Sequence, residues 1–415
     1  MRNRAIPTLD ADHDSPGHTR PAGPNQQRIL PPDGRNKSVN GYDGQGVHAG
    51  GAMVEFVVEV PPGLPGWEPL FLAGSGAALG HWAAAGVPLE RWEDGTARAR
   101  VGFPPASRVQ YLVTRGRWRL AESDGDGRER APRELVARAD ATVELTVAGW
   151  GRDAVRYHPD FGSRFLPHAR PISVFVPPGY DLETHRRYPV LYMHDGQNLF
   201  DAETAFAGVP WAADEVAERE ARRHAADPVI VVGVGNTVDR LKEYAPRRDG
   251  SDAADDWSAA YGRFLVEEVK PFIDRTYRTA TGPAATGVAG SSMGGLISLH
   301  LAQCYPHVFG RCAALSPSLW WDREFFLSTA GTDWPRDCRV WLDTGEDEGM
   351  GRVGRLGNLT RTRKLARLFA EAGLASGRDY AYREVPGGTH NEAAWHARFD
   401  QVLRFLFPPH SSHAV

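Results

Sequence analysis

The sequence predicts two domains, a small antiparallel β-sandwich followed by a larger α/β domain with a mostly parallel sheet. Two changes of pattern along the 415 residues support this prediction. Short β-rich runs, separated by turn residues about every ten positions, fill residues 51–151, as in small sandwiches. From residue 152 to residue 409, apolar strands alternate with helical stretches, which is typical of a parallel sheet covered by helices.

The first domain contains six runs with strand-like composition, and no long amphipathic helix interrupts them. These runs are MVEFVVEVPP (53–62), EPLFLAGSG (68–76), TARARVGFPP (96–105), RVQYLVTRG (108–116), RWRLAES (117–123) and ATVELTVAGW (141–150).

The second domain contains seven strand-like runs, several of them continuously apolar, as expected when helices cover both faces of a sheet. The strands are expected at 171–178, 188–196, 228–236, 286–292, 311–318, 339–346 and 380–388. Helices are expected at 211–223, 257–277, 294–305, 361–373 and 393–407, where apolar residues recur at helical spacing.

Composition limits the classes of protein and partner. Residues 1–50, rich in Pro, Gly, Asn and Asp, are predicted to form a disordered tail, and 410–415 a short terminal tail.

A net charge of −4, from 48 basic and 52 acidic residues, favours neither a nucleic-acid nor a membrane partner. No secretory or membrane-spanning stretch is apparent, so a soluble, cytoplasmic protein is expected. The three cysteines, with no C-x-x-C spacing, predict no disulfide, metal or cofactor.

The sequence GSSMG at residues 290–294 is a G-x-S-x-G motif with Ser292 at its centre. The residues before it resemble a strand and those after it a helix, which is the setting of a nucleophile elbow. That position at the junction selects Ser292 over the neighbouring Ser291 as the candidate nucleophile.

A serine hydroxyl needs a base and an acid that orients the base. His390 follows the last expected strand, in a glycine-bearing loop before the final helix, and is the candidate base. The acid is expected between them in the chain, where RVWLDTGEDEGMG (339–351) offers Asp343 at the end of the strand and Glu346, Asp347 and Glu348 in the loop after Gly345. Serine, acid and histidine in this order are typical of the α/β-hydrolase fold.

An oxyanion hole needs two N–H donors aimed at one point. The backbone N–H of Met293, directly after the candidate nucleophile, is one candidate. The second is expected in the turn after the strand at 188–196, at Gly196 or, in preference, Gln197. His194 and Asp195 in the same segment lack the spacing of a metal site, so structural roles are expected for them.

Several blocks of the second domain resemble the putative esterase family, which includes esterase D, enterochelin esterases, feruloyl and acetyl-xylan esterases, and mycolyltransferases. The blocks include YPVLYMHDGQNLFD, GSSMGGLISLHLAQCYPHVFGRCAALSPSLWW and GGTHNEAAW, and the resemblance covers residues 155–408. It implies a serine carboxylic-ester hydrolase that forms an acyl-serine and acts on a small-molecule ester of the siderophore, acylated-sugar or feruloyl type. Two alternatives are acyl transfer to a sugar acceptor, and a carbohydrate-binding protein with a relic hydrolase domain.

Carried over to this sequence, the resemblance implies Ser292 as nucleophile, His390 as base and Glu348 as acid, with Asp347 as the alternative acid. Trp320 and Trp321 match a segment that borders the substrate pocket in relatives, although tryptophans packed beneath a loop would give the same pattern.

The first domain resembles a starch-binding carbohydrate-binding module over residues 53–150. Exposed tryptophans can stack on sugar rings, so Trp82, Trp92 and Trp118 are candidate glycan contacts. Trp82 and Trp118 match sugar-contacting positions of relatives. The alternative is that these aromatic residues belong to the core of a small sandwich.

Overall fold

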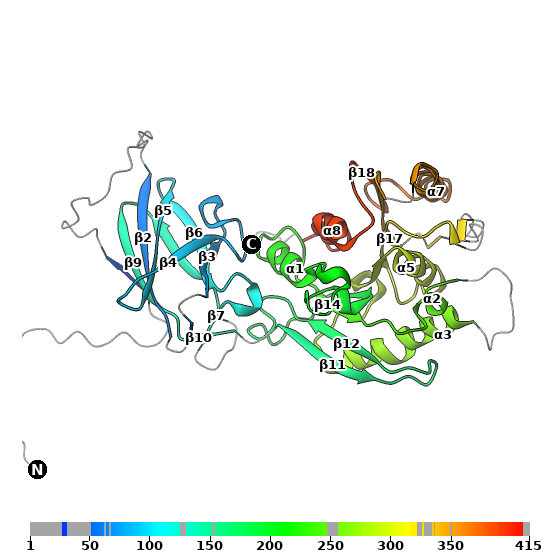
Figure 1. Ribbon diagram of the computed structural model, residues 1–415, viewed down its shortest axis with the longest axis horizontal. Coiled ribbons are helices and arrows are strands. Elements are labelled where there is room, and N and C mark those ends of the chain that lie inside the picture. The colour runs from blue at the N-terminus through cyan, green and yellow to red at the C-terminus, as the bar shows by residue number, and fades with distance from the viewer. Residues whose placement is uncertain are drawn as a thin grey trace, which may run out of the picture.

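The two predicted domains are present in the computed structural model, with the sandwich at one end and the α/β domain at the other (Figure 1). The structure describes residues 27–30, 51–61, 64–65, 68–124, 130–151, 154–246, 256–321, 326–327, 334–335, 337–348 and 351–409. The predicted tails, at residues 410–415 and at 1–50 apart from 27–30, lie outside these ranges.

The sandwich strands follow the spatial order β1-β9-β2-β5-β4-β3-β6-β8. Their bounds are β1 (Gln27–Leu30), β2 (Ala52–Glu59), β3 (Leu70–Gly74), β4 (Val87–Arg91), β5 (Thr96–Phe103), β6 (Ser107–Thr114), β8 (Arg133–Ala137) and β9 (Ala141–Thr146), with the short strands β7 (Glu122–Ser123) and β10 (Gly149–Trp150) paired beside them. Alternate residues of β2, namely Val54, Phe56 and Val58, are fully buried in the sandwich core. The pairing is not wholly antiparallel as predicted, because β9 lies parallel to β2.

The prediction of a disordered tail is wrong at one place. Residues Gln27–Leu30 form β1, which pairs antiparallel with the edge strand β9, and the Tyr111 hydroxyl donates to Gln27 Oε1 at 2.9 Å. An edge strand presents unpaired backbone groups that a short segment can satisfy. The strand was missed because its neighbours in the sequence are polar and its apolar content is limited to Ile29 and Leu30.

The α/β domain contains an eight-stranded sheet of order β11-β12-β14-β13-β15-β16-β17-β18. The bounds are β11 (Val155–Phe161), β12 (Arg170–Phe175), β13 (Val190–His194), β14 (Ile230–Val234), β15 (Thr286–Ser291), β16 (Arg311–Leu315), β17 (Arg339–Gly345) and β18 (Tyr380–Val385). From β14 to β18 neighbouring strands are parallel, and β11 and β12 form an antiparallel edge. Strand β11 was not predicted, since this mostly exposed edge strand contains a proline and little apolar surface.

Helices cover both faces of this sheet. They are α1 (Ala213–Arg222), the short α2 (Arg240–Glu243), α3 (Trp257–Arg263) continued through the π-helical η5 (Phe264–Val269) into α4 (Lys270–Thr276), α5 (Met293–Cys304), α7 (Gly351–Glu371) and α8 (Glu392–Leu406). Within the described residues, no helix is both long enough and apolar enough to cross a bilayer.

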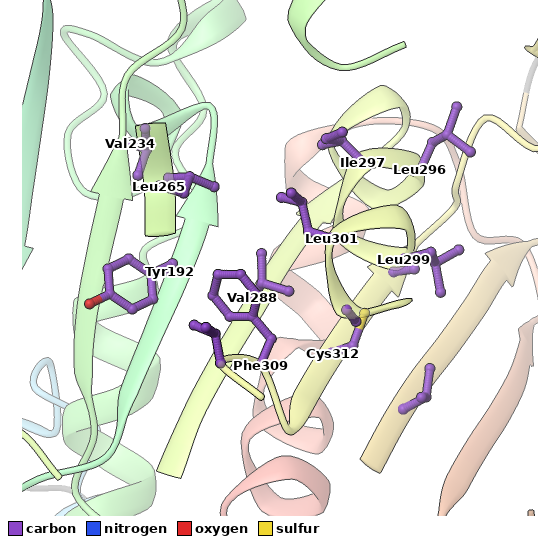
Figure 2. Close-up of a cluster of buried hydrophobic side chains, with 14 of the residues drawn as sticks. Tyr192, Val234, Leu265, Val288, Leu296, Ile297, Leu299, Leu301, Phe309 and Cys312 are labelled. Carbon is purple, nitrogen blue, oxygen red and sulfur yellow. The ribbon is translucent and has the colours of Figure 1, made fainter. Parts of the chain in front are cut away.

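Successive side chains of the central strands point to opposite faces of the sheet, so the hydrophobic core is divided into two layers. On β13, Val190 and Tyr192 point to the layer that contains α3, α4 and α5, whereas Leu191 and Met193 point to the layer that contains α1 and α8. Figure 2 shows the first layer, in which Leu301 of α5 packs near Val288 of β15. Strands that are buried on both faces explain the continuous apolar runs in the sequence.

The sandwich contacts the α/β domain through two tryptophans and helix α1. Trp82 and Trp118 are 2% and 7% exposed, their rings lie 5.8 Å apart, and the Arg222 guanidinium of α1 lies 5.4 Å and 4.7 Å from their ring centres. This burial favours the alternative interpretation, in which the two rings belong to a packed core, and the glycan contact stays a prediction. Trp92 is exposed, with Arg98 at 4.3 Å from its ring.

A carboxyl group lies at this interface. The Trp118 backbone N–H donates to Glu215 Oε1 at 3.3 Å. Burial, together with the neighbouring carboxylates Asp214 and Glu218, raises the pKa of Glu215 to about 8, although the Trp118 N–H and Arg117 act in the opposite direction. This shift favours the protonated form of Glu215 in the folded protein at neutral pH.

We expect Glu215→Gln to make the protein's stability less dependent on pH. Between the unfolded pKa, near 4.3, and the folded value of about 8, only the folded state keeps the Glu215 proton, so its contribution to stability falls as pH rises. The free energy of unfolding of the wild type should therefore fall relative to the variant from pH 5 to pH 8, by at most about 1.4 kcal/mol per pH unit. Denaturant unfolding at several pH values measures this difference, with Glu144→Gln on exposed β9 as the control. A difference that does not change with pH would contradict the expectation.

Candidate active site

Ser292 occupies a sharp turn between β15 and α5. Its φ of 56° and ψ of −121° are unusual for a residue with a Cβ, and such strained serines are typical of nucleophile elbows. A Cβ on Gly290 would lie 2.7 Å from the Gly294 carbonyl carbon, and one on Gly294 would lie 3.3 Å from His194 Cβ. The two motif glycines therefore allow the strand, the helix and β13 to approach one another closely.

His390 lies in the loop between β18 and α8. The next residue, Asn391, caps α8 by accepting a hydrogen bond from the Ala394 N–H at 3.0 Å, which fixes the start of the helix. The His390 ring packs edge to face with the ring of buried Trp395 of α8, with 5.1 Å between ring centres. The imidazole is 34% exposed and so remains accessible from solvent.

Glu348 is the acidic residue that contacts the histidine. Its Oε2 lies 3.3 Å from His390 Nδ1, while its Oε1 accepts a hydrogen bond from the Gly345 N–H at 2.7 Å. Burial alone would raise the pKa of Glu348, but hydrogen bonds from His390, Ser316 and Gly345 outweigh it and lower the pKa to about 2. The carboxylate is therefore ionised across the physiological range.

The other acidic candidates lie elsewhere. Asp347 is exposed, and its backbone N–H donates to the Gly388 carbonyl. Asp343 is fully buried, where its carboxylate accepts from Arg398 at 2.9 Å and from Trp341 Nε1 at 2.7 Å. These buried hydrogen bonds indicate that Asp343 has a structural role beneath the site.

A cavity of about 240 Å³ joins these groups. It is lined by Ser292, Ser316, Pro317, Ser318, Trp320, Glu348, Asn358 and His390. Ser318 Oγ lies 3.2 Å from Ser292 Oγ, and Trp320 is 43% exposed. Trp321, in contrast, is half-buried and packs against the main core, so only the first of the two predicted pocket tryptophans lines the cavity.

Three polar lining residues were not singled out from the sequence, namely Ser316, Ser318 and Asn358. Ser316 follows β16 with a φ of 46°, and its Oγ accepts from Arg398 at 2.8 Å and from Trp395 Nε1 at 3.1 Å. Its hydroxyl proton is left to donate to Glu348. The usable signal for the two serines was their position, because SPS (316–318) directly follows β16, which is parallel to the strand that leads to Ser292.

The second oxyanion candidate lies in the short helical turn η3 (Gly196–Asn198). A Cβ on Gly196 would lie 2.5 Å from the Gly233 carbonyl carbon, so glycine is required there. The position of Gly294 next to His194 and Asp195 places this turn beside the elbow. The N–H groups of Met293 and Gln197 each lie in the first turn of a helical segment, where helix geometry provides no acceptor.

Polar contacts hold the η3 turn in place. Gln197 Oε1 accepts from the Asn236 N–H at 3.2 Å, and Asn198 Nδ2 donates to Glu392 Oε1 at 3.3 Å, which links the turn to the start of α8.

His194 and Asp195 have partners within the fold. His194 Nδ1 lies 2.8 Å from the Tyr261 hydroxyl, and burial lowers the pKa of this histidine to about 3. The Asp195 carboxylate accepts two hydrogen bonds from Arg240, at 2.6 Å and 2.8 Å. Their contacts agree with the structural roles expected of them.

The sheet order, the elbow and the chain order of the site residues define an α/β-hydrolase. The sequence model of the family described as "Putative esterase" matches residues 163–406, and the chain belongs to this family. It is a carboxylic-ester hydrolase.

Comparisons with known proteins give several similar chains. The uncharacterised protein YbbA of Bacillus subtilis is 23% identical over 244 residues, which are 57% of this chain and 92% of that protein. The ferri-bacillibactin esterase BesA of the same organism is 27% identical over 156 residues, 34% of this chain and only about half, 51%, of that protein. The crystal structure of the enterobactin esterase FES from Shigella flexneri, at 16% identity and a TM-score of 0.48, covers 85% of this chain and 92% of its own.

Replacing each of the two adjacent acids, Glu348 and Asp347, by its amide should have unequal effects on kcat. Glu348→Gln removes the charge that faces His390 and should lower kcat by about 10³- to 10⁴-fold, as loss of the orienting acid does in serine hydrolases. Asp347→Asn, on the exposed neighbour, should leave kcat close to that of the wild type. Hydrolysis of p-nitrophenyl acetate by both variants measures this. A larger loss in Asp347→Asn would move the assignment to Asp347.

Proposed function

We propose that this protein hydrolyses its ester through an acyl-Ser292 intermediate, with His390 as base and Glu348 as the acid that orients it. The observation that carries the proposal is the common cavity of Ser292, Glu348 and His390, with the Glu348–His390 contact at 3.3 Å.

In the first half-reaction, Ser292 Oγ forms a bond to the ester carbonyl carbon while His390 takes the hydroxyl proton. The N–H groups of Met293 and Gln197 would receive the oxyanion. Collapse of the tetrahedral intermediate breaks the carbon–oxygen bond to the alcohol, which leaves with the proton from His390. In the second half-reaction, His390 takes a proton from water as its oxygen forms a bond to the acyl carbon. The intermediate then collapses by breaking the bond to Ser292 Oγ, which takes the proton back from His390, and the carboxylic acid is released.

The natural substrate is proposed to be an ester with a bulky, partly apolar acyl group, of the siderophore, feruloyl or acylated-sugar type. Support comes from the exposed face of Trp320 in the cavity and from the similarity to the ferri-bacillibactin esterase. Transfer of the acyl group to a sugar instead of water is the alternative outcome, which product analysis with added trehalose distinguishes. Glycan binding at Trp82 and Trp118 has less support, because both rings are at most 7% exposed and the Arg222 guanidinium lies over them.

Replacing the nucleophile should abolish turnover. Ser292→Ala should reduce kcat on p-nitrophenyl acetate by at least about 10⁴-fold, because no other group in the cavity forms the acyl intermediate. Ser291→Ala, which removes the neighbouring hydroxyl, is the matched control and should retain activity. Mass spectrometry after treatment with a fluorophosphonate should find the label on Ser292. Activity in Ser292→Ala, or a label on another serine, would refute the mechanism.

Shortening Trp320 should change KM for esters with a large acyl group more than for esters with a small one. Trp320→Ala removes an apolar surface that an aromatic acyl group would cover, so KM for a feruloyl ester should rise about tenfold. KM for an acetyl ester should change little, since acetyl is too small to use this surface. Steady-state kinetics on both esters test the expectation, with Trp92→Ala on the sandwich as control. Equal changes for the two esters would place the acyl group elsewhere.

A further inference from the structure

Asn358 is a polar residue of the cavity with no part in the mechanism above. It lies on α7, and its Nδ2 donates to Glu348 Oε2 at 2.6 Å and to Thr344 Oγ1 at 3.1 Å. The Oε2 atom that receives this hydrogen bond is the one that faces His390 Nδ1. Asn358 therefore contacts the carboxylate oxygen that the mechanism uses.

Both oxygens of Glu348 are held by donors. Oε1 is held by the Gly345 N–H at 2.7 Å, and Oε2 by Asn358 and His390. A carboxylate fixed at both oxygens cannot rotate about its last side-chain bond without losing hydrogen bonds. A short contact from an amide N–H also favours the ionised form of the carboxyl group, because only an acceptor can face this donor.

The contact is made at a cost to Asn358 itself. Its Oδ1 is buried and finds no hydrogen-bond partner among the described residues. A buried polar atom without a partner is unfavourable for folding, and an apolar side chain of similar shape would remove that penalty. An amide at this position is thus explained by its contact with Glu348 rather than by the stability of α7.

We propose that Asn358 is a positioning residue, which holds the Glu348 carboxylate ionised and aimed at His390. This inference rests on the proposed function, since it assigns Asn358 a role only if Glu348 orients the base. The acid is then supported from two sides, by Ser316 after β16 and Gly345 at the end of β17 on one side, and by Asn358 of α7 on the other.

Two substitutions test the proposal through different properties. Asn358→Asp keeps the shape but places a second carboxyl group 2.6 Å from Glu348, and two such groups cannot both ionise readily. The acid limb of the kcat/KM profile should move to higher pH by about one unit or more. Asn358→Leu removes the donor, so kcat should fall about tenfold to a hundredfold with little change in KM, which is more than any change in Tm accounts for.

The measurements are pH profiles of p-nitrophenyl acetate hydrolysis and thermal unfolding of the full chain. Thr360→Asp, which adds a charge on an exposed position of α7, is the control for general electrostatic effects and should keep the wild-type profile. A wild-type profile in Asn358→Asp, or a wild-type kcat in Asn358→Leu, would overturn the role of Asn358. Loss of activity in Asn358→Leu in proportion to a lowered Tm would also overturn it, since that result indicates a purely structural residue.

Failure of the proposed function gives a different result. If fluorophosphonate leaves Ser292 of the wild type unlabelled and Glu348→Gln retains activity, the mechanism itself is wrong, whatever Asn358 variants do. If Ser292 is labelled and Glu348→Gln is inactive while both Asn358 variants behave as wild type, the inference on Asn358 alone fails.

Discussion

The close approach of β15, α5 and β13 around the elbow is the constraint on which the site depends. Ser292 adopts a positive φ because the strand must reverse into a helix within one residue. The turn is possible because a side chain is absent at Gly290 and Gly294, where a Cβ would meet backbone or the side chain of His194. The strain is sustained by a buried central strand whose neighbours, β13 and β16, are hydrogen-bonded along its length.

Parallel pairing brings the other groups to the same edge of the sheet. The η3 turn follows β13, Ser316 follows β16, Glu348 follows β17 and His390 follows β18. Because parallel strands end at one edge, residues almost two hundred positions apart in the chain meet there. Beneath them, the buried pair of Asp343 and Arg398 anchors Ser316, which in turn contacts Glu348. A fixed framework of this kind favours precise orientation of the catalytic groups.

The contact between the domains includes two tryptophans that their sequence motif predicts on an exposed, ligand-binding surface. Trp82 and Trp118 lie together, as expected for a pair of aromatic residues that recognise one ligand. In this chain, the guanidinium of Arg222 lies over both rings, and the Trp118 backbone contacts Glu215. Helix α1 thus covers part of both rings, and the pair joins the two domains.

The sequence alone determined the local features, because strand and helix periodicity and the glycine spacing of the elbow are encoded by near neighbours. The two-domain order, the seven predicted strands of the α/β sheet and the position of Ser292 follow from these patterns. Tertiary structure decided what depends on distant segments. Glu348 and Asp347 are adjacent in one loop, and only the packing of that loop against α7 and the β18–α8 loop turns Glu348 inward. The same reason applies to Asn358, Trp321 and the buried tryptophan pair, whose surroundings come from segments that periodicity does not place.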